Sequence, residues 1–137
     1  MRPFFLLVLG LAACGTTAGE RWDEVQGADW LLWRIGGAPA LAGADVSLTF
    51  GVGRLYGEAV NRYGGPYVRT EDKLKIESIG ATRKFLDKPP GAMEQEARYL
   101  KLLEQVDGWK IGGGWLDLTR GGTTVLAFKL KVSTSRS

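Results

Sequence analysis

The sequence predicts an α+β protein that is mostly antiparallel β-sheet and contains one helix. Three observations favour this fold class. Apolar residues alternate with polar ones along several short segments, which is the period of a half-buried strand. The 20 glycines in 137 residues favour many turns and short strands over a helical bundle. Only one long stretch, residues 92–106, has the 3.6-residue apolar period of a helix.

Composition excludes several classes of function. The formal net charge of +3 is small and dispersed, so we expect no nucleic-acid partner, which would need a basic stripe. The chain has one cysteine and no histidine. These two counts exclude zinc sites built from cysteine and histidine, and catalysis by Ser-His-Asp or Cys-His groups. No acidic calcium loop is present either, so we expect no metal and no cofactor.

The first fourteen residues indicate a lipoprotein signal. Residues 1–13 carry one positive charge, at Arg2, and then an apolar run. The run is too short for a membrane-spanning helix, which needs about 20 residues. Leu11-Ala12-Ala13-Cys14 resembles the bacterial lipobox, which implies that Cys14 becomes the diacylated N-terminus after cleavage. The alternative is an ordinary signal peptide whose cysteine is incidental. Gly15, in place of an aspartate, directs a lipoprotein of a Gram-negative cell to the outer membrane, facing the periplasm.

Composition also divides the mature chain. Residues 14–28 are small, polar and charged, and are expected to form a lipidated tether. Trp22 in its middle is unusual for a tether, and is expected either to dock on the domain or to lie at the lipid interface. Residues 29–131 are expected to form one folded domain, and residues 132–137 a flexible tail.

The first part of the domain is predicted to be a meander of strands. Trp30–Ile35 is densely apolar and ends at a Gly-Gly turn. Val46, Leu48 and Phe50 alternate with polar residues, as in a half-exposed strand. A glycine turn then leads into the stretch Gly53–Tyr67, around which the chain is organised.

The stretch Gly53–Tyr67 is predicted to begin as a strand and to break at Asn61–Pro66. Two glycines there can adopt positive φ, and Pro66 gives up a backbone donor. The next strand covers residues 73–79, with Leu74 and Ile76 facing inward.

The helix at residues 92–106 is predicted to bury one apolar face, and we expect Leu100 and Leu103 to be buried. Glu94 and Glu96 near its start suit the helix dipole. Two glycine hairpins complete the domain, one joining strands at residues 109–111 and 115–119, and one leading into residues 124–130. The predicted apolar face of the helix consists of Met93, Ala97, Tyr99, Leu100, Leu103 and Val106.

Three segments resemble the META domain family, the HslJ-like envelope proteins, in residues and in order. They are the glycine strand that runs into Asn61–Tyr67, the pair Thr82-Arg83, and Met93–Leu100. The resemblance covers about residues 27–128. It implies a compact, curved, barrel-like sheet with the helix packed against it. It also implies a non-enzymatic envelope lipoprotein, linked to envelope stress or antibiotic tolerance, that binds a partner, either an envelope protein or a small ligand.

The signature residues have two interpretations. Asn61 and the two arginines could bind an anionic ligand or partner. The structural interpretation is favoured: Asn61 satisfies loop backbone groups, and Arg83 pairs with a glutamate at the helix start. The candidate signature residues are Asn61, Arg62, Tyr63, Gly65, Tyr67 and Arg83.

Two positions hold aliphatic residues where members of the family have cysteines. They are Val60 and Leu86. A lone thiol left in an oxidising envelope invites wrong pairing, so both cysteines would be lost together if they touched. We therefore predict that Val60 and Leu86 are buried and near each other.

Other patterns have simpler interpretations. Gly51–Gly57 resembles a phosphate loop but precedes a strand, so a hairpin is favoured. Asp87, Glu94 and Glu96 could form a carboxylate pair for glycoside cleavage, but helix-start electrostatics explain the glutamates better. Trp30, Trp33, Trp109 and Trp115 are expected in the core. As an alternative, aromatic residues at a barrel mouth would make the protein a carrier of a small apolar or peptide ligand.

Overall fold

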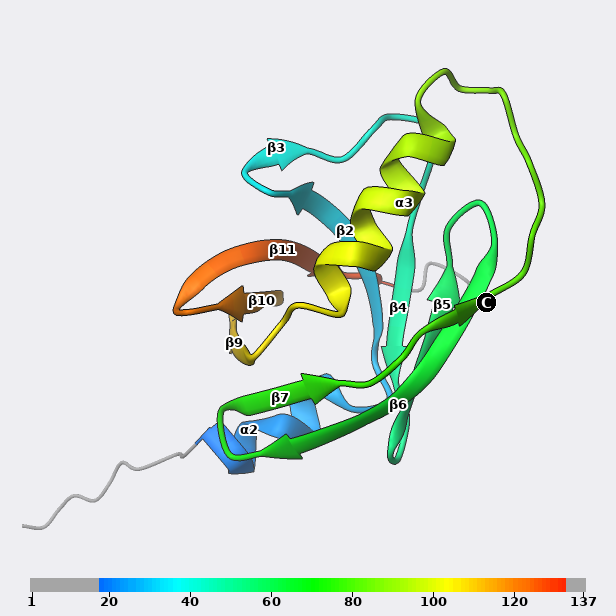
Figure 1. The fold of residues 1–137 in the computed structure, drawn as a ribbon. Helices are drawn as coiled ribbons and strands as arrows, with labels where there is room; N and C mark the ends of the chain where they lie inside the picture. The colour runs from blue at the N-terminus through cyan, green and yellow to red at the C-terminus, as the bar shows by residue number, and fades with distance from the viewer. Residues whose placement is uncertain (1–17, 133–137) are drawn as a thin grey trace, which may run out of the picture.

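The computed structural model describes residues 18–132, which form two helices and one antiparallel sheet (Figure 1). The helices are α2 (Ala18–Val25) and α3 (Ala92–Leu103). The strands are β2 (Asp29–Ile35), β3 (Ala38–Pro39), β4 (Ser47–Phe50), β5 (Arg54–Glu58), β6 (Arg62–Thr70), β7 (Lys73–Ile76), β8 (Gly80–Ala81), β9 (Gly108–Gly112), β10 (Trp115–Arg120) and β11 (Thr123–Leu130).

The sheet closes on itself into a barrel. The strands follow the order β11-β10-β9-β7-β6-β5-β4-β2, and β11 also pairs with β2. Eight strands therefore form the barrel, while β3 and β8 add short pairings to β2 and β6. The weakest join is between β7 and β9, where the register contains only Lys73 and Gly108. The structure confirms the predicted α+β, barrel-like fold with one packed helix.

Paired glycines make the last two hairpins, as predicted. Gly113 and Gly114 join β9 to β10, with φ of 57° and 82°. Gly121 and Gly122 join β10 to β11, with φ of 58° and 84°. Two consecutive residues with positive φ give the turn whose twist matches that of the flanking strands.

The predicted break in the strand over Asn61–Pro66 is correct only at Asn61. The chain turns at residues 59–61, and β6 then runs without a break from Arg62 to Thr70. Gly64 and Gly65 lie inside this strand and neither has positive φ. A glycine is needed here because neighbouring backbone lies very close to the strand. A Cβ at Gly65 would lie 2.5 Å from the Ser78 carbonyl oxygen.

Helix α2 corrects the predicted tether over residues 14–28. Within it, Trp22 is 4% exposed and Val25 is fully buried. The Trp22 ring meets Phe50 at 5.1 Å and Trp109 at 4.9 Å between ring centroids, both edge to face. Trp22 thus docks on the domain, and α2 belongs to the folded unit that was predicted to begin only at residue 29. Residues 14–17 lie outside the described part of the chain.

Helix α3 ends at Leu103 rather than at residue 106, and its buried face is rotated from the predicted one. Leu103 is fully buried, as predicted, but Leu100 is only partly buried and Ala97 is exposed. The buried residues of the helix are Ala92, Glu96, Tyr99 and Leu103. The Glu96 carboxylate thus occupies a core-facing position that was not part of the predicted apolar face.

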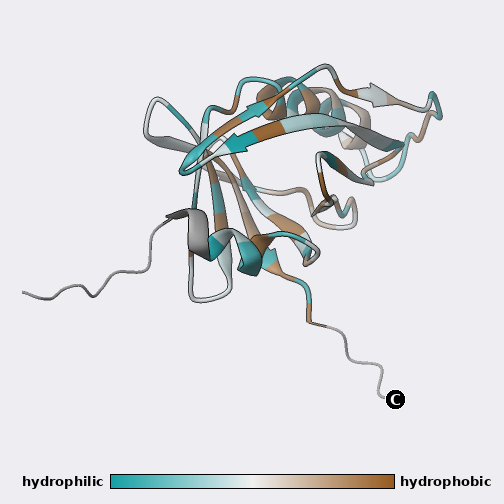
Figure 2. Cartoon of the chain, turned by 90° about the horizontal axis from the view of Figure 1, so that it is seen from below, coloured by the Kyte–Doolittle hydropathy of each residue, from teal (hydrophilic) through white to brown (hydrophobic). Residues whose placement is uncertain are grey.

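Apolar side chains fill the barrel interior. Strand alternation places them there, and Figure 2 shows hydrophobic and hydrophilic residues interleaved along the strands. The predicted inward residues Leu48, Phe50, Leu74 and Ile76 are all 3% exposed or less. The largest fully buried side chains are Trp30, Tyr99, Phe50, Phe128, Leu48, Leu55, Leu74, Leu103, Leu116, Leu118, Leu126 and Val25.

Candidate functional site

Asn61 ties three segments together at the end of the barrel covered by α3. It lies in the turn between β5 and β6 and is 2% exposed. Its backbone N–H donates to Glu96 Oε2 (2.6 Å), and its Nδ2 donates to Glu96 Oε1 (2.9 Å). Nδ2 also reaches the Lys84 carbonyl (3.3 Å), while Oδ1 accepts from Thr82 Oγ1 (2.9 Å) and from the Lys84 N–H. Its whole hydrogen-bonding capacity is used inside the protein.

The burial of Glu96 is the feature of this cluster that the sequence analysis missed. Its side chain projects from α3 into the core, and the residue is 7% exposed. A buried carboxylate is tolerated only when hydrogen bonds replace its water, and here Asn61 supplies them. Its position in the sequence could have indicated this burial. Glu96 lies four residues after Ala92 and three before Tyr99, so it shares a helix face with these two buried residues.

Two signature tyrosines also make internal hydrogen bonds. Tyr63 donates its hydroxyl proton to the Ser47 carbonyl (2.5 Å), so the Tyr99 hydroxyl donates to Tyr63 across 2.6 Å. Burial raises the pKa of both hydroxyls well above the ordinary tyrosine value. Tyr67 is 7% exposed and donates to the Gly51 carbonyl, and burial raises its pKa as well.

The remaining signature residues divide between packing and surface. Gly65 is buried where β6 passes close to the Ser78 backbone. Arg62 and Arg83 are exposed. The expected pairing of Arg83 with a helix-start glutamate is wrong, since the ion pair found among residues 18–132 joins Arg21 to Glu24 (3.1 Å). Of the signature, only the two arginines are therefore presented to solvent.

Val60 and Leu86 line the same small hollow, together with Ala92 and Glu96, but they do not form a buried pair. The hollow has a volume of about 120 Å³. Leu86 is 49% exposed and Val60 is half-buried. The predicted burial of both residues is wrong, because Leu86 belongs to the irregular segment between β8 and α3, which runs over the surface. The argument from paired cysteine replacement fails with it.

The outer face of the barrel carries an exposed tryptophan pair. Trp33 is 46% exposed and Trp115 is 39% exposed, and their rings meet edge to face at 5.9 Å. The Lys129 amine lies 4.1 Å from the Trp33 ring centroid and 5.6 Å from that of Trp115, close enough for a cation–π interaction with each. The core position expected for these two tryptophans is wrong, whereas Trp30 and Trp109 are buried as predicted.

A bulge in β2 explains why Trp33 faces outward. In the register with β11, Leu32 pairs with Phe128 and Arg34 pairs with Ala127, which leaves Trp33 as the extra residue. Trp33 and Arg34 are therefore both exposed. Bulges re-aim side chains in this way and are frequent beside functional sites.

These residues surround a groove that we call the tryptophan groove. Its volume is about 360 Å³. Ala127 pairs with Arg34 on one side and with Asp117 on the other, so a small side chain lies between two larger walls. The groove is lined by Trp33, Arg34, Gly37, Trp115, Asp117, Thr124, Val125 and Ala127.

Comparison with protein families identifies the chain. The family model of the META domain matches residues 23–133. The chain belongs to the META domain family. The match begins inside α2, which agrees with the inclusion of that helix in the folded unit.

Two solved structures resemble this META domain. An NMR structure of a protein from Burkholderia xenovorans is 21% identical with a TM-score of 0.64, over 96% of this chain and 100% of that one. A second NMR structure is 20% identical with a TM-score of 0.62, over 79% of this chain and 92% of that one. At this identity the likeness shows the fold alone. The search of curated proteins found no match.

The META domain thus has two polar regions with different chemistry. The signature cluster around Asn61 and Glu96 is internally satisfied, so its groups serve the fold. The tryptophan groove presents aromatic faces, the Arg34 guanidinium and the Asp117 carboxylate to solvent. Among residues 18–132 no three His, Cys, Asp or Glu side chains gather as metal ligands, and no helix is long and apolar enough to cross a membrane. The groove is suited to non-covalent binding.

Proposed function

We propose that this protein is a lipid-anchored bacterial envelope protein that acts by binding a partner and not by catalysis. The observation that carries the binding role is the contrast between its two polar regions. Asn61 and Glu96 satisfy each other inside the barrel, while Trp33 and Trp115 stand 46% and 39% exposed beside a groove. Tryptophan and arginine are the residues enriched where proteins bind partners, and the groove holds both.

The anchor in this proposal is the only cysteine of the chain. Cys14 ends the lipobox-like run Leu11-Ala12-Ala13-Cys14, and three residues separate it from helix α2. Each buried CH₂ of an acyl chain contributes about 0.8 kcal/mol, so two or three chains hold a protein to a bilayer almost irreversibly. Gly15 supports an outer-membrane location facing the periplasm in a Gram-negative cell.

We propose a role without catalysis because the polar groups of the signature are engaged in internal hydrogen bonds. The signature residues with reactive side chains, Tyr63 and Tyr67, donate to backbone carbonyls and have raised pKa values, so they are poor bases and nucleophiles. A link to envelope stress or antibiotic tolerance is part of the proposal through the family. The alternative role, carrying a small apolar or peptide ligand, would use the external groove, because core side chains fill the barrel.

Fatty-acid labelling in cells tests the anchor. Wild-type protein should take up label and sediment with membranes, whereas Cys14→Ser should lose both properties and remain as the longer precursor. Thr16→Ser is the matched control, since it alters a neighbouring residue outside the lipobox and should be labelled like wild type. Equal labelling of Cys14→Ser and wild type, or no labelling of wild type, would refute the anchor.

Complementation of a deletion strain tests the binding role. Under envelope stress or antibiotic exposure, Trp33→Ala combined with Trp115→Ala should complement poorly although the protein is present at normal level. Tyr56→Ala is the matched control, because Tyr56 is 53% exposed on β5, outside the groove. Full complementation by the groove variant would contradict a binding role for the groove.

A further inference from the structure

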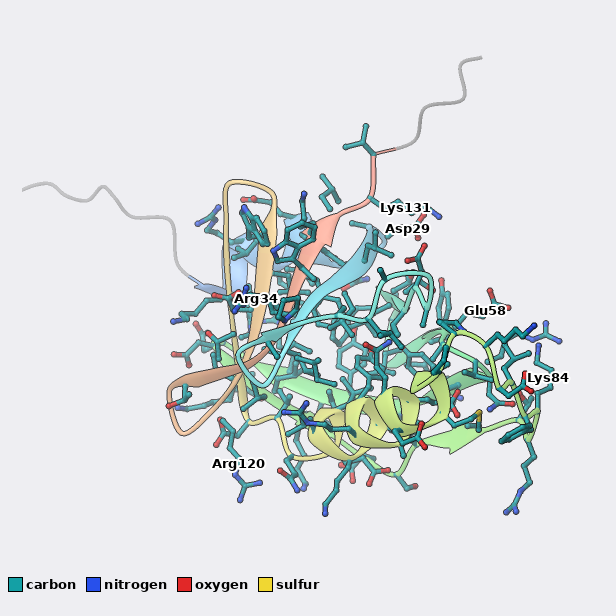
Figure 3. All side chains as sticks on the ribbon, turned by 90° about the horizontal axis from the view of Figure 1, so that it is seen from above. Asp29, Arg34, Glu58, Lys84, Arg120 and Lys131 are labelled. Carbon is teal, nitrogen blue, oxygen red and sulfur yellow. The ribbon has the colours of Figure 1, made fainter. Side chains whose placement is uncertain are left out.

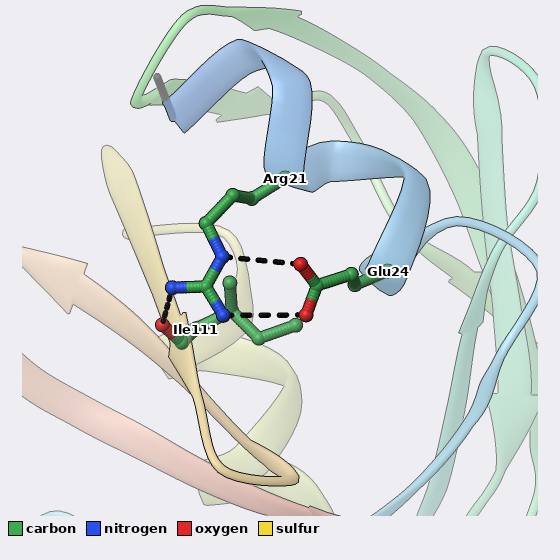
Figure 4. A network of polar contacts seen from close by, with 3 residues as sticks. All are labelled: Arg21, Glu24 and Ile111. Carbon is green, nitrogen blue, oxygen red and sulfur yellow. Dashed lines mark hydrogen bonds and ion pairs between the residues drawn. The ribbon is translucent and has the colours of Figure 1, made fainter. Parts of the chain in front are cut away.

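Three parts of the chain meet at one end of the barrel: the first turn of α2, the tip of the β9–β10 hairpin and the end of β11. Arg21 Nη1 donates to the Ile111 carbonyl (3.1 Å), and its ion pair with Glu24 holds the guanidinium in place (Figure 4). The Leu130 N–H donates to the Gly114 carbonyl (2.9 Å). The start of α2, where the chain enters the domain, therefore lies beside the β9–β10 hairpin. The end of β11 lies beside the tip of the same hairpin.

This end of the barrel exposes apolar and basic side chains together. Trp115 follows directly after the hairpin tip, and Trp33 lies against it. Leu130 is 42% exposed and Val132 is 73% exposed. Lys131 lies at the same end, near Asp29 (Figure 3), and its N–H donates to the Asp29 carbonyl (2.8 Å). We call the set the anchor-side surface: Trp33, Trp115, Leu130, Val132, Lys110, Lys129 and Lys131.

The length of chain before α2 limits how far this surface can be from a membrane. Cys14 and Ala18 are four residues apart in the sequence. Four residues span at most about 14 Å even when fully extended. An acylated Cys14 lies at the bilayer surface, so the first turn of α2 must lie within that distance of it. A bilayer interface with its headgroups is itself several ångströms deep, and apolar faces of proteins enter it by about 5–10 Å.

We propose that the anchor-side surface docks on the bilayer that holds the acyl chains of Cys14, with Trp33 and Trp115 in the headgroup layer. This inference rests on the proposed lipid anchor, and it names the bilayer as the partner that the tryptophan groove meets. Tryptophan is enriched at membrane interfaces because its ring is apolar and its N–H is polar. The amine of Lys129 lies over the tryptophan rings, where it can reach lipid phosphates while its stem covers apolar surface.

The charged residues on and near the anchor-side surface predict how strongly docking depends on anionic lipid. Asp117 is the cross-strand neighbour of Lys110, and the Asp29 backbone lies beside that of Lys131, so two acidic residues accompany the three lysines and keep the net charge of this region small. Docking should therefore depend mainly on the tryptophans and only weakly on the fraction of anionic lipid. A second copy of the chain or a soluble protein could cover the same surface, and the experiment below distinguishes them.

Tryptophan fluorescence tests the docking directly. Full-length lipidated protein is reconstituted into vesicles of phosphatidylethanolamine and phosphatidylglycerol with and without brominated phosphatidylcholine, which quenches only tryptophans in contact with lipid. The wild-type emission should be quenched by the brominated lipid and protected from iodide in the water. The double variant Trp33→Phe, Trp115→Phe should lose most of the lipid quenching, because Trp22, Trp30 and Trp109 are 4% exposed or less.

Controls separate the possible outcomes. Tyr56→Phe, on another face, should be quenched like wild type, and thermal melts of the double variant verify its fold. A wild type that fails to sediment with vesicles overturns the lipid anchor. A protein that sediments but shows equal lipid quenching in wild type and double variant overturns the docking and leaves the anchor intact. Iodide access to wild type, or crosslinking between copies through this surface, also overturns the docking.

Discussion

Replacing Asn61 by alanine should destabilise the domain more than any other substitution in the signature turn. The change removes the Nδ2 donor to Glu96 Oε1 (2.9 Å) and the Oδ1 acceptor of Thr82 and of the Lys84 N–H. The Asn61 backbone N–H still reaches Glu96 Oε2 (2.6 Å), so the carboxylate loses only part of its solvation.

The magnitude follows from the groups left without partners. A buried polar group that loses its partner costs about 1–3 kcal/mol, and a charged one costs more. The carboxylate oxygen of Glu96 and the Lys84 N–H lose a partner, whereas the exposed Thr82 hydroxyl can turn to water, so we expect a loss of about 2–4 kcal/mol in the free energy of unfolding. That is a large share of the roughly 5–15 kcal/mol that stabilises a domain of this size. At roughly 4 °C per kcal/mol, the melting temperature should fall by about 8–16 °C.

Urea melts of the wild type and two variants measure this loss. Arg62→Ala is the matched control, because Arg62 is the next residue and is exposed. It should change the free energy of unfolding by less than about 0.5 kcal/mol, as surface substitutions do. If Asn61→Ala costs no more than Arg62→Ala, the network around Glu96 does not hold the turn to the helix, and the structural role of the signature is refuted.

Three further predictions concern the core. Burial raises the pKa of the Tyr63 and Tyr99 hydroxyls, so the unfolded chain releases these protons at a lower pH than the folded chain does. The free energy of unfolding should therefore fall as pH rises above about 10. In thermal melts across pH, Tyr63→Phe should make that fall less steep. Leu103→Ala should cost about 2–5 kcal/mol in denaturant melts, and Leu100→Ala distinctly less, since only Leu103 is fully buried; equal losses would contradict the observed helix face. Trp22→Ala should cost about 3–5 kcal/mol, whereas a near-neutral result would mean that α2 is not part of the core.

The parts of the fold that follow from local patterns could be predicted from the sequence. Alternation placed Leu48, Phe50, Leu74 and Ile76 in the core, because a strand sends successive side chains to opposite faces. Glycine pairs placed the last two hairpins. Helix α2 was missed because it has only eight residues, and its apolar contacts are concentrated at Trp22 and Val25.

The parts that depend on tertiary partners could not be predicted in this way. Hydrophobic periodicity cannot assign a glutamate to the core, and Glu96 is buried only because Asn61, 35 residues away, meets it there. Gly64 and Gly65 suggested a turn, but their lack of side chains serves the close packing of neighbouring backbone. Trp33 faces outward because of a bulge in the pairing of β2 with β11, and no local pattern marks that bulge.

The lipid anchor that we propose at Cys14 is central to the function of this protein, and the mass of the intact protein tests it most directly. Protein purified from the membranes of its own host should begin at Cys14 and carry the added mass of two or three acyl chains. Treatment with base, which cleaves the ester-linked chains, should lower that mass in the matching steps. A mature chain that begins at another residue, or one that begins at Cys14 without acyl mass, would contradict the account.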